Sequence, residues 1–384
     1  MRKKIIITHE FAPFRGGVAT YCAEAARAAV ALGQAGEVEV WTPGSGGPAW
    51  EEGVRVVRLG GKPSLRLGNL LRFAAAIFRR RAELRDGRVI LASVGAQLIF
   101  LQFHRLGLLR GIEAMPLFHG SEILRYEQSR SLNAPAKRWL AARPAIFAAS
   151  RHVRRLLLES GLLPVGKEVT VAPCGLRGDL RARAEIVQPE APAQGGPVRV
   201  LTLARLHPRK GQLDTVRALA ALPAAVRSGL VYQLGGGLDG GGAAYFHEVE
   251  QACRKGGVPL DYLGEIPDER LAETYAQCDL YVMSSRTLPR SVEGFGMTYL
   301  EAGAFGKPVI GYRTGGVAEA VREGESGLLV DEGDIAALTA ALEKLVGDAA
   351  LRRAMGEAGR AHAQARTWDE AARTLCGDLP IKAP

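Results

Sequence analysis

The sequence predicts an α/β protein in which two sheets of parallel strands follow one another along the chain. At 384 residues the chain is long enough for two domains of ordinary size. Short β-branched runs alternate with longer helical patterns in two successive sets, which is the pattern of Rossmann-like domains. Residues 184–197 separate the sets and are rich in Pro and Gly without apolar periodicity. We therefore expect domains at 1–183 and 198–365, a linker between them, and a C-terminal helix within 366–384.

The first set begins with Lys4–Thr8, a β-branched run that predicts a buried strand. A glycine loop and an alanine-rich helix to Leu32 follow it, and together they form the first half of a βαβ unit. Further strands are expected at Val38–Thr42, Val54–Leu59, Val89–Ala92, Leu98–Phe100, Met115–Phe118, Ala145–Ser150 and Val169–Pro173, and helices at Ser64–Arg81 and Arg151–Leu158.

The second set repeats this alternation from Val198 onward. We expect strands at Val198–Leu203, Val231–Leu234, Leu280–Ser284 and Val309–Tyr312, a strand ending in Tyr262–Pro267, and helices at Gln212–Leu222, Leu271–Gln277 and Arg366–Cys376. Open parallel sheets bind ligands beyond the carboxyl ends of their strands, so the loops after these strands are where candidate site residues are sought.

Composition excludes several classes of protein. The chain is 47% hydrophobic and 23% charged, as in soluble globular proteins. In the first ten residues the apolar run is too short, and charged residues come too soon, for a signal peptide. Val89–Phe103 is too short and too polar for a membrane span. Five scattered cysteines without Cys-x-x-Cys spacing predict a reducing cytoplasm, with neither disulfides nor a zinc site.

Charge is unevenly distributed along the chain. Residues 1–187 contain 29 Lys and Arg against 15 Asp and Glu, whereas the remainder contains 21 against 25. This asymmetry favours an anionic partner for the first domain, and without a nucleic-acid module a membrane or an anionic acceptor is preferred to nucleic acid. The basic helix Ser64–Arg81 is a candidate for peripheral contact with the inner face of the membrane. The alternative is that its Leu/Phe stripe packs on the sheet and its arginines are solvated.

The stretch Ser291–Glu301 carries the strongest functional pattern. Glu293 and Glu301 flank a Gly-Phe-Gly turn that opens a helix running to about Gly306. Glycines let backbone N–H groups approach a ligand, and a helix N-terminus favours a phosphate. Glu293, in the loop, and Glu301, inside the helix, are then available for hydroxyl groups. The alternative is a Glu that favours the helix dipole and a surface Glu further on.

Three other places follow the expected strands. Gly16 and Gly17 precede the first long helix, where the backbone could approach a phosphate, although such a pair is often only a tight turn. His119 follows the strand Met115–Phe118, and a lone His is more often structural than functional. Arg205 and Lys210 bracket the loop after Val198–Leu203, where their charges suit phosphate oxygens but are commonly just solvated.

Together these motifs resemble the retaining glycosyltransferases of family 4, which have the GT-B fold. The resemblance rests on Glu293-x7-Glu301 around Gly-Phe-Gly, on Arg205-x4-Lys210-Gly, and on the His-Gly at His119, and it covers nearly the whole chain. It implies two Rossmann-like domains that face each other across a cleft and a C-terminal helix that crosses back to the first domain. The segment Arg286–Arg290 is most similar to the branch that makes phosphatidylinositol mannosides. Cys174-Gly departs from the family's usual Asn-Gly, which leaves the local role of Cys174 open.

The resemblance implies a hexosyltransferase that uses a GDP-, UDP- or ADP-sugar and a hydroxyl acceptor, which is a lipid, a glycan or a small molecule. It implies catalytic roles for His119 and Glu293. The implied donor site consists of Gly16, Gly17, Arg205, Lys210, Gly294, Phe295, Gly296, Met297 and Glu301, with Glu301 on the ribose. Because the sequence has no Asp-x-Asp, we expect metal independence, and no cofactor is expected. The alternatives are a nucleotide-sugar epimerase of the GT-B fold and a non-catalytic nucleotide-sugar-binding protein.

Overall fold

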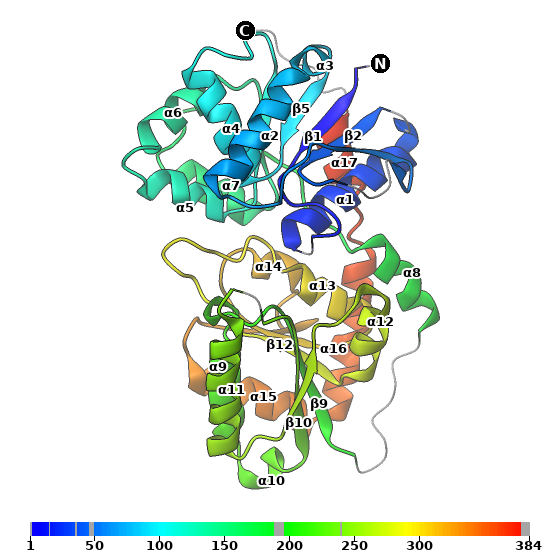
Figure 1. Ribbon diagram of the computed structural model, residues 1–384. Coiled ribbons are helices and arrows are strands. Elements are labelled where there is room, and N and C mark those ends of the chain that lie inside the picture. Colours follow the sequence, from blue (N-terminus) through cyan, green and yellow to red (C-terminus); the bar gives the residue numbers. More distant parts are fainter. Residues whose placement is uncertain are drawn as a thin grey trace. The chain divides into compact units, whose positions relative to one another are not determined.

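The computed structural model describes residues 2–14, 16–34, 37–45, 50–187, 196–238 and 240–377. The chain divides into two compact units (Figure 1). Unit 1 consists of Met1–Cys174 together with the segment from Thr367, and unit 2 of Gly175–Arg366. The boundary expected after residue 183 lies inside a helix of unit 2, and residues 188–195 of the expected linker lie outside the described residues. The C-terminal helix belongs to unit 1, as the resemblance implies.

Unit 1 is built on a largely parallel sheet with the strand order β3-β4-β2-β1-β5-β6-β7-β8, in which only the β3–β4 pairing of the described strands is antiparallel. The strands are β1 (Lys4–Ile7), β2 (Val38–Thr42), β3 (Trp50–Glu51), β4 (Val54–Arg58), β5 (Arg88–Leu91), β6 (Ala114–Phe118), β7 (Phe147–Ala148) and β8 (Thr170–Val171). The strand order runs outward from β1 in both directions, so the switch point of the sheet lies at the carboxyl ends of β1 and β5.

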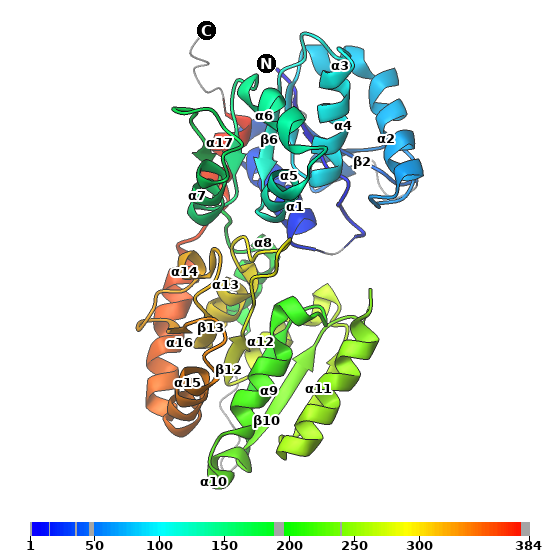
Figure 2. The same cartoon turned by 90° about the vertical axis from the view of Figure 1, so that its left-hand side faces the viewer.

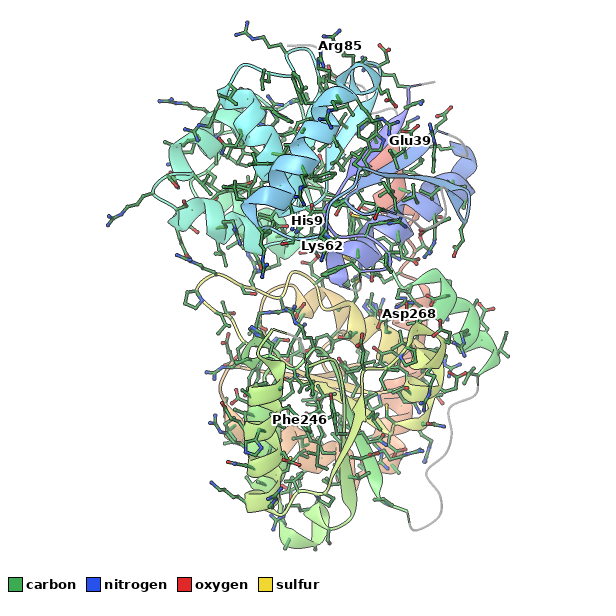
Figure 3. All side chains as sticks on the ribbon, viewed as in Figure 1. His9, Glu39, Lys62, Arg85, Phe246 and Asp268 are labelled. Atoms are coloured by element: carbon green, nitrogen blue, oxygen red, sulfur yellow. The ribbon has the colours of Figure 1, made fainter. Side chains whose placement is uncertain are left out.

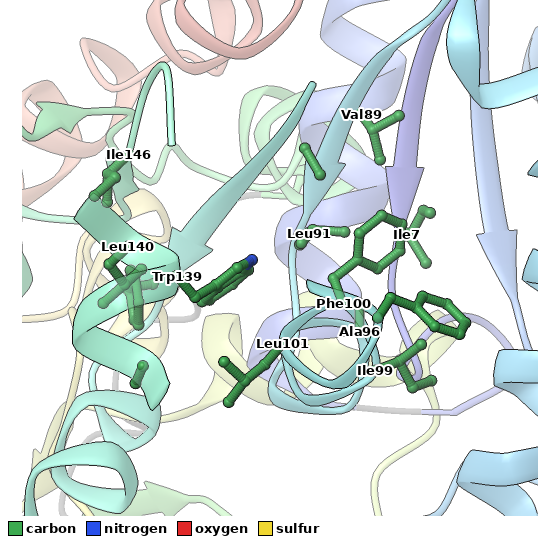
Figure 4. Close-up of a cluster of buried hydrophobic side chains, with 14 of the residues drawn as sticks. Ile7, Val89, Leu91, Ala96, Ile99, Phe100, Leu101, Trp139, Leu140 and Ile146 are labelled. Atoms are coloured by element: carbon green, nitrogen blue, oxygen red, sulfur yellow. The ribbon is translucent and has the colours of Figure 1, made fainter. Parts of the chain in front are cut away.

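Helices cover both faces of this sheet (Figure 2). They are α1 (Gly17–Ala29), continued by a π-helical turn (Val30–Gln34), α2 (Leu67–Arg79), α3 (Arg81–Arg85), α4 (Val94–Arg105), α5 (Ser121–Gln128), α6 (Asn133–Ala141), α7 (Arg151–Glu159) and α17 (Asp369–Cys376). Helices α2 and α4–α7 bury side chains in one core, where Trp139 of α6 points toward Phe100 and Leu101 of α4 (Figure 4). Helices α1 and α17 pack together on the opposite face, with Tyr21 against Trp368.

The strand expected at Leu98–Phe100 is wrong, because these residues lie inside α4. Ala96, Ile99, Phe100 and Phe103 are buried at the spacing of one helical face. A short apolar run cannot be assigned to a strand or a helix by periodicity alone, and here the helix begins directly after Ser93, whose backbone is extended.

Unit 2 contains a second parallel sheet, in the order β11-β10-β9-β12-β13-β14. Its strands are β9 (Val198–Leu203), β10 (Leu230–Gly235), β11 (Leu260–Gly264), β12 (Leu280–Met283), β13 (Val309–Tyr312) and β14 (Gly327–Val330). Its helices are α8 (Gly178–Ile186), a 3₁₀ turn (Pro208–Lys210), α9 (Gln212–Ala220), α10 (Ala224–Arg227), α11 (Gly242–Gly256), α12 (Asp268–Gln277), α13 (Met297–Ala304), α14 (Val317–Ala320), α15 (Ile335–Gly347) and α16 (Ala349–Gln364).

The two faces of this sheet are covered by different helix groups. Helices α9, α11 and α15 share one hydrophobic core, and Phe246 of α11 (labelled in Figure 3) packs against Tyr262 of β11 with ring centroids 4.2 Å apart. Helix α13 packs against α16, α8 and α14 on the other side (Figure 2). The strand order reverses between β9 and β12, so the loops that leave these neighbouring strands meet at the switch point of unit 2.

Candidate functional site

The loops after β9 and β12 bring two cations and a carboxylate together. Lys210 Nζ lies 2.7 Å from Glu293 Oε2, and an Arg209 guanidinium nitrogen lies 2.9 Å from the same oxygen. The Ser285 hydroxyl donates to this oxygen as well, at 3.2 Å. The 3₁₀ turn Pro208–Lys210 presents both cations to the same oxygen. These residues are 83 and 84 positions from Glu293 in the sequence, and the adjacency of β9 and β12 brings them together.

Electrostatics keep this cluster ionised. Burial alone would raise the pKa of Glu293, but the charges and hydrogen bonds of Lys210 and Arg209 lower it to about 2. Burial lowers the pKa of the Lys210 ammonium, and the Glu293 carboxylate offsets part of that effect. The side chains of Glu293 and Lys210 are 12% and 17% exposed, so the pair is largely shielded from water yet reachable by a ligand.

Close glycine packing fixes the loop that carries Glu293. The Gly316 N–H donates to the Glu293 carbonyl at 2.9 Å. A Cβ on Gly315, which has a φ of +55°, would lie 1.9 Å from that carbonyl oxygen. The Thr314 hydroxyl donates to the Ser285 carbonyl at 2.8 Å, which ties the same two segments together. The position of the carboxylate is therefore set by backbone contacts as well as by its ion pairs.

The expected Gly-Phe-Gly turn leads directly into α13. Gly296 has a φ of +90° and precedes Met297, the first residue of the helix, while the Phe295 side chain is buried. Glu293 lies in the loop before the helix, as the sequence predicts. The first N–H groups of a helix have no partner within it, and those of α13 begin at Met297, four residues after Glu293.

Glu301 lies inside α13 and is almost completely buried, in a different environment from Glu293. Burial raises the pKa of Glu301, and the charge of Arg177 and a 2.8 Å hydrogen bond from the Tyr275 hydroxyl oppose that effect in part. Arg177 is itself paired with Asp179 at 2.7 Å. Glu301 is thus a shielded acceptor whose partners, Tyr275 and Arg177, the sequence alone did not identify.

The two basic residues expected to act together are placed differently. Arg205 is exposed, and its carbonyl accepts a hydrogen bond from the Gln212 side chain at 3.2 Å. The cation that joins Lys210 on Glu293 is Arg209, which sequence reasoning missed. Its adjacency to Lys210 in a loop after a strand was the available signal, because a tight turn can direct neighbouring side chains to one point.

In unit 1, His119 directly follows β6 at the carboxyl edge of the sheet, as expected. Its Nε2 lies 3.0 Å from the Ala92 carbonyl, and its ring meets Tyr21 edge-on with centroids 5.0 Å apart. Burial lowers the pKa of His119 to about 4, against a raising effect of the Ala92 hydrogen bond. The imidazole is therefore neutral at pH 7. Since a carbonyl only accepts, Nε2 carries the proton and Nδ1 is the nitrogen able to accept a hydrogen bond.

A second histidine stands at the same edge and was not singled out from the sequence. His9 follows β1 (Figure 3), its backbone N–H donates to the Ser93 hydroxyl at 2.9 Å, and its Nε2 lies 3.3 Å from Glu10. Burial, followed by the charge of Arg125, lowers the pKa of His9 to about 4. Gly16 and Gly17 lie in the loop from the same strand, where Gly16 precedes α1 and Gly17 is its first residue.

Two features typical of other protein classes are absent from the described part of the chain. There, no group of three or more His, Cys, Asp or Glu side chains is arranged to hold a metal ion. Within the same residues, no helix combines the length and apolarity needed to span a bilayer.

Comparison with known families matches nearly the whole chain in two successive segments. The family model described as Glycosyltransferase Family 4 matches residues 15–178, and that described as Glycosyl transferases group 1 matches residues 184–362. The chain belongs to glycosyltransferase family 4.

Known members of this family are similar to the chain over part of its length. A GDP-mannose-dependent alpha-(1-6)-phosphatidylinositol monomannoside mannosyltransferase of Mycolicibacterium smegmatis is 38% identical over 165 residues, which are 42% of each chain. A D-inositol 3-phosphate glycosyltransferase of Corynebacterium jeikeium is 36% identical over 174 residues, 44% of this chain and 40% of that one. These alignments span less than half the length of the relatives.

The similarity to a solved structure covers nearly the whole of this chain. HepE of Anabaena, in complex with UDP and glucose, superposes with a TM-score of 0.75 over 98% of each chain at 19% sequence identity. This likeness concerns the fold. With the two parallel sheets described above, it confirms the expected GT-B architecture of two Rossmann-like domains.

Proposed function

We propose that this chain is a retaining, metal-independent glycosyltransferase that moves a hexose from a nucleotide diphosphate sugar to a hydroxyl acceptor. The observation that carries the proposal is the cluster of Lys210, Arg209 and Glu293 beside the N-terminus of α13. When a glycosidic phosphate bond breaks, negative charge accumulates on the departing diphosphate. Fixed cations and N–H donors in a shielded site stabilise that charge without reorganising, which is an efficient means of catalysis.

The ion pairs of Glu293 suggest how the cluster would change when a donor binds. Arg209 and Lys210 both pair with Glu293, whose single negative charge balances only one of the two positive charges, so the cluster keeps a net positive charge that suits an anion. A diphosphate would compete for Lys210, with Arg205 and the Gly294–Met297 amides as further donors. The Glu293 carboxylate would then be free to accept hydrogen bonds from sugar hydroxyls. Glu301 would accept hydrogen bonds from the ribose, and Gly16 and Gly17 would allow close approach to the diphosphate.

The proposed reaction is a substitution at the anomeric carbon on one face of the sugar. The bond from that carbon to the diphosphate oxygen breaks, and its electron pair leaves with the diphosphate. The acceptor oxygen forms the new bond on the same face, and its proton passes to the departing phosphate oxygen. His119, neutral and with Nδ1 as acceptor, would hold a sugar hydroxyl in position during this step.

The relatives guide the choice of donor and acceptor. The mycobacterial relative is named as GDP-mannose-dependent and as acting on a phosphatidylinositol mannoside, while HepE was solved with UDP. We therefore propose GDP-mannose as the first donor to test and a lipid-linked hydroxyl as the first acceptor, with UDP- and ADP-sugars as the competing donors.

An acceptor of this kind would be reached at the cytoplasmic face of a membrane, and α2 is the proposed contact. Leu67 and Leu71 are 72% and 60% exposed, one helical turn apart. Arg66 and Arg72 are exposed beside them, while Phe73 and Ile77 are buried in the core. Exposed leucines next to arginines suit the surface of an anionic bilayer.

A thermal-shift panel with UDP-, GDP- and ADP-sugars, with and without EDTA, tests the donor site. Because ligand binding stabilises the folded state by mass action, the preferred donor should raise Tm, and EDTA should not change this. The variant Lys210→Ala should lose the shift, and Lys255→Ala, which removes an exposed lysine of α11, should keep it.

A transfer assay with the preferred donor then separates the candidate functions. Transfer requires donor consumption matched by a glycosylated acceptor with the donor's anomeric configuration. Donor conversion without acceptor product would indicate an epimerase, and binding without either would indicate a non-catalytic protein. No shift with any donor would contradict the proposal.

A further inference from the structure

Unit 1 contains a pocket at the edge of its sheet opposite to His119. The pocket has a volume of about 300 Å³ and lies between the end of α4, the loop to β6, and Arg143, which follows α6. Strand β6 begins at Ala114 beside this loop and ends just before His119. Roughly 16 Å of strand therefore separate the pocket from the carboxyl edge of the sheet, where His119 lies. The volume is at the lower end of the usual range for small-molecule sites. Neither the proposed reaction nor the sequence motifs use this pocket.

The pocket has an apolar floor. Phe100 and Phe103 from one face of α4 and Ile112 from the following loop line it, and all three are buried. Leu108, which also lines the pocket, is 37% exposed at its rim. An isolated inorganic anion would leave this surface unused, so the floor favours a ligand with an apolar part.

Two arginines and a histidine surround this floor. His104, Arg110 and Arg143 line the pocket, and none of them forms an ion pair with an Asp or Glu of the described ranges. The Arg143 guanidinium donates to the Trp139 carbonyl at 3.1 Å, so its position is fixed by the backbone of α6. Burial lowers the pKa of Arg143, and it also lowers that of His104, where the charge of Arg143 adds to the effect. Arg110 and Arg143 therefore bring positive charge that no carboxylate of the described residues balances, while His104, mainly neutral at pH 7, can donate a hydrogen bond.

The loop that closes the pocket is conformationally strained. Leu109 has a φ of +56°, in the left-handed region that side chains other than Gly rarely adopt. Gly107 and Gly111 flank it with φ values of +66° and +82°. Strained backbone of this kind is found at ligand sites more often than elsewhere, because a binding geometry has to be held.

We propose that this pocket binds an amphiphilic anion, which places a phosphate or carboxylate against Arg143, Arg110 and His104 and an alkyl or aryl tail on Phe100, Phe103 and Ile112. The contact needs no covalent step. The site is separate from the proposed donor site, and the inference does not depend on the transferase activity.

Octyl phosphate is the probe for the whole amphiphile. Inorganic phosphate serves as the control for its anionic head group, and 1-octanol as the control for its alkyl tail. Binding is measured by isothermal titration on the full chain carrying Lys210→Ala, so that phosphate bound at the proposed donor site is not counted. We expect octyl phosphate to bind at least about tenfold more tightly than either fragment, because both halves of the pocket contribute.

Two variants and a matched control locate the site. Arg143→Gln and Arg110→Gln should each weaken octyl phosphate binding by about 10- to 100-fold, since each removes a charged hydrogen-bond donor. Arg110 is exposed and makes no side-chain hydrogen bond within the described residues, so Arg110→Gln is informative even if Arg143→Gln misfolds. Arg138→Gln, which changes an exposed arginine of α6 outside the pocket, should bind as before.

Equal affinity of the parent and Arg110→Gln chains would overturn the proposal, and so would fragments that bind as tightly as octyl phosphate. The source of the ligand follows from sedimentation with phosphatidylcholine vesicles with and without phosphatidic acid. If Arg110→Gln also weakens vesicle binding, the pocket takes a lipid, and if it weakens only octyl phosphate binding, the pocket takes a soluble amphiphile. Both results support an amphiphilic anion site.

Discussion

The ion pairs of Glu293 make a quantitative prediction about stability. In Glu293→Gln the side chain keeps its shape but loses its charge, so Lys210 and Arg209 remain largely buried without a carboxylate. The Glu293 pKa of about 2, against an ordinary value of 4.5, corresponds to about 3 kcal/mol of stabilisation at neutral pH. Removing one partner of a buried ion pair commonly costs roughly 3–5 kcal/mol, which agrees with this value.

The sign of the pH dependence follows from the direction of the shift. Because the folded-state pKa lies below the ordinary value, the stabilisation is fully present above pH 4.5 and is lost as the pH falls toward 2. The difference in unfolding free energy between the parent and Glu293→Gln should therefore be about 3 kcal/mol at pH 7 and shrink steadily below pH 4.5.

Urea denaturation followed by far-UV circular dichroism measures this difference. None of the four tryptophans of the chain falls within Gly175–Arg366, so tryptophan fluorescence does not report the unfolding of unit 2 and circular dichroism is used instead. The control is Glu250→Gln, whose carboxylate is 42% exposed and should contribute less than about 1 kcal/mol. A loss below about 1 kcal/mol at pH 7 in Glu293→Gln, or a loss of the same size at pH 3, would refute the reasoning.

Four further predictions address other parts of the proposed site. Gly315→Ala should destabilise the protein by about 2–4 kcal/mol and Gly324→Ala by about 1 kcal/mol in urea denaturation, because both have positive φ but only the first Cβ would strike the Glu293 carbonyl. Equal losses would mean that the contact is unimportant. His119→Ala should lower kcat by at least about 100-fold, and undiminished turnover would exclude its role. In the pH–rate profile of the parent enzyme, titration of His119 should cause no change in rate between pH 5.5 and 7.5, because its pKa of about 4 keeps the imidazole neutral there. EDTA dialysis should leave the transfer rate unchanged within about twofold, and restoration of a lost rate by Mg²⁺ or Mn²⁺ would contradict metal independence.

Much of the fold could be predicted because strands and helices leave local periodic patterns. The strands Lys4–Thr8 and Val198–Leu203 were found within a residue of their observed bounds, since each is a compact β-branched run beside a glycine loop. Leu98–Phe100 failed because three apolar residues fit either period. The unit boundary at Cys174 also escaped prediction, since helix α8 has no composition that distinguishes one domain from the next.

The geometry of the candidate site could be predicted where it depends on residues adjacent in the sequence. It could not be predicted where it depends on the order of strands in the sheet. Glu293 and the turn before α13 are local and were found. The pairing of Arg209 with Glu293 joins positions 84 apart and follows from β9 lying beside β12, which no single-sequence pattern states. Arg143 and His104 come from separate segments, and only the three-dimensional structure shows that they line one pocket and that Arg143 forms no ion pair with a carboxylate of the described residues.

The return of α17 to unit 1 has a consequence for biosynthesis. On the ribosome, the strands of unit 1 emerge first, but the helix that covers Tyr21 emerges only after all of unit 2 has been translated. Until then the apolar surface of α1 that meets α17 is uncovered and available to chaperones or to aggregation. Unit 2, which is continuous in sequence, can complete its core during this interval. Unit 2 would then finish folding before unit 1, although the synthesis of unit 1 begins earlier.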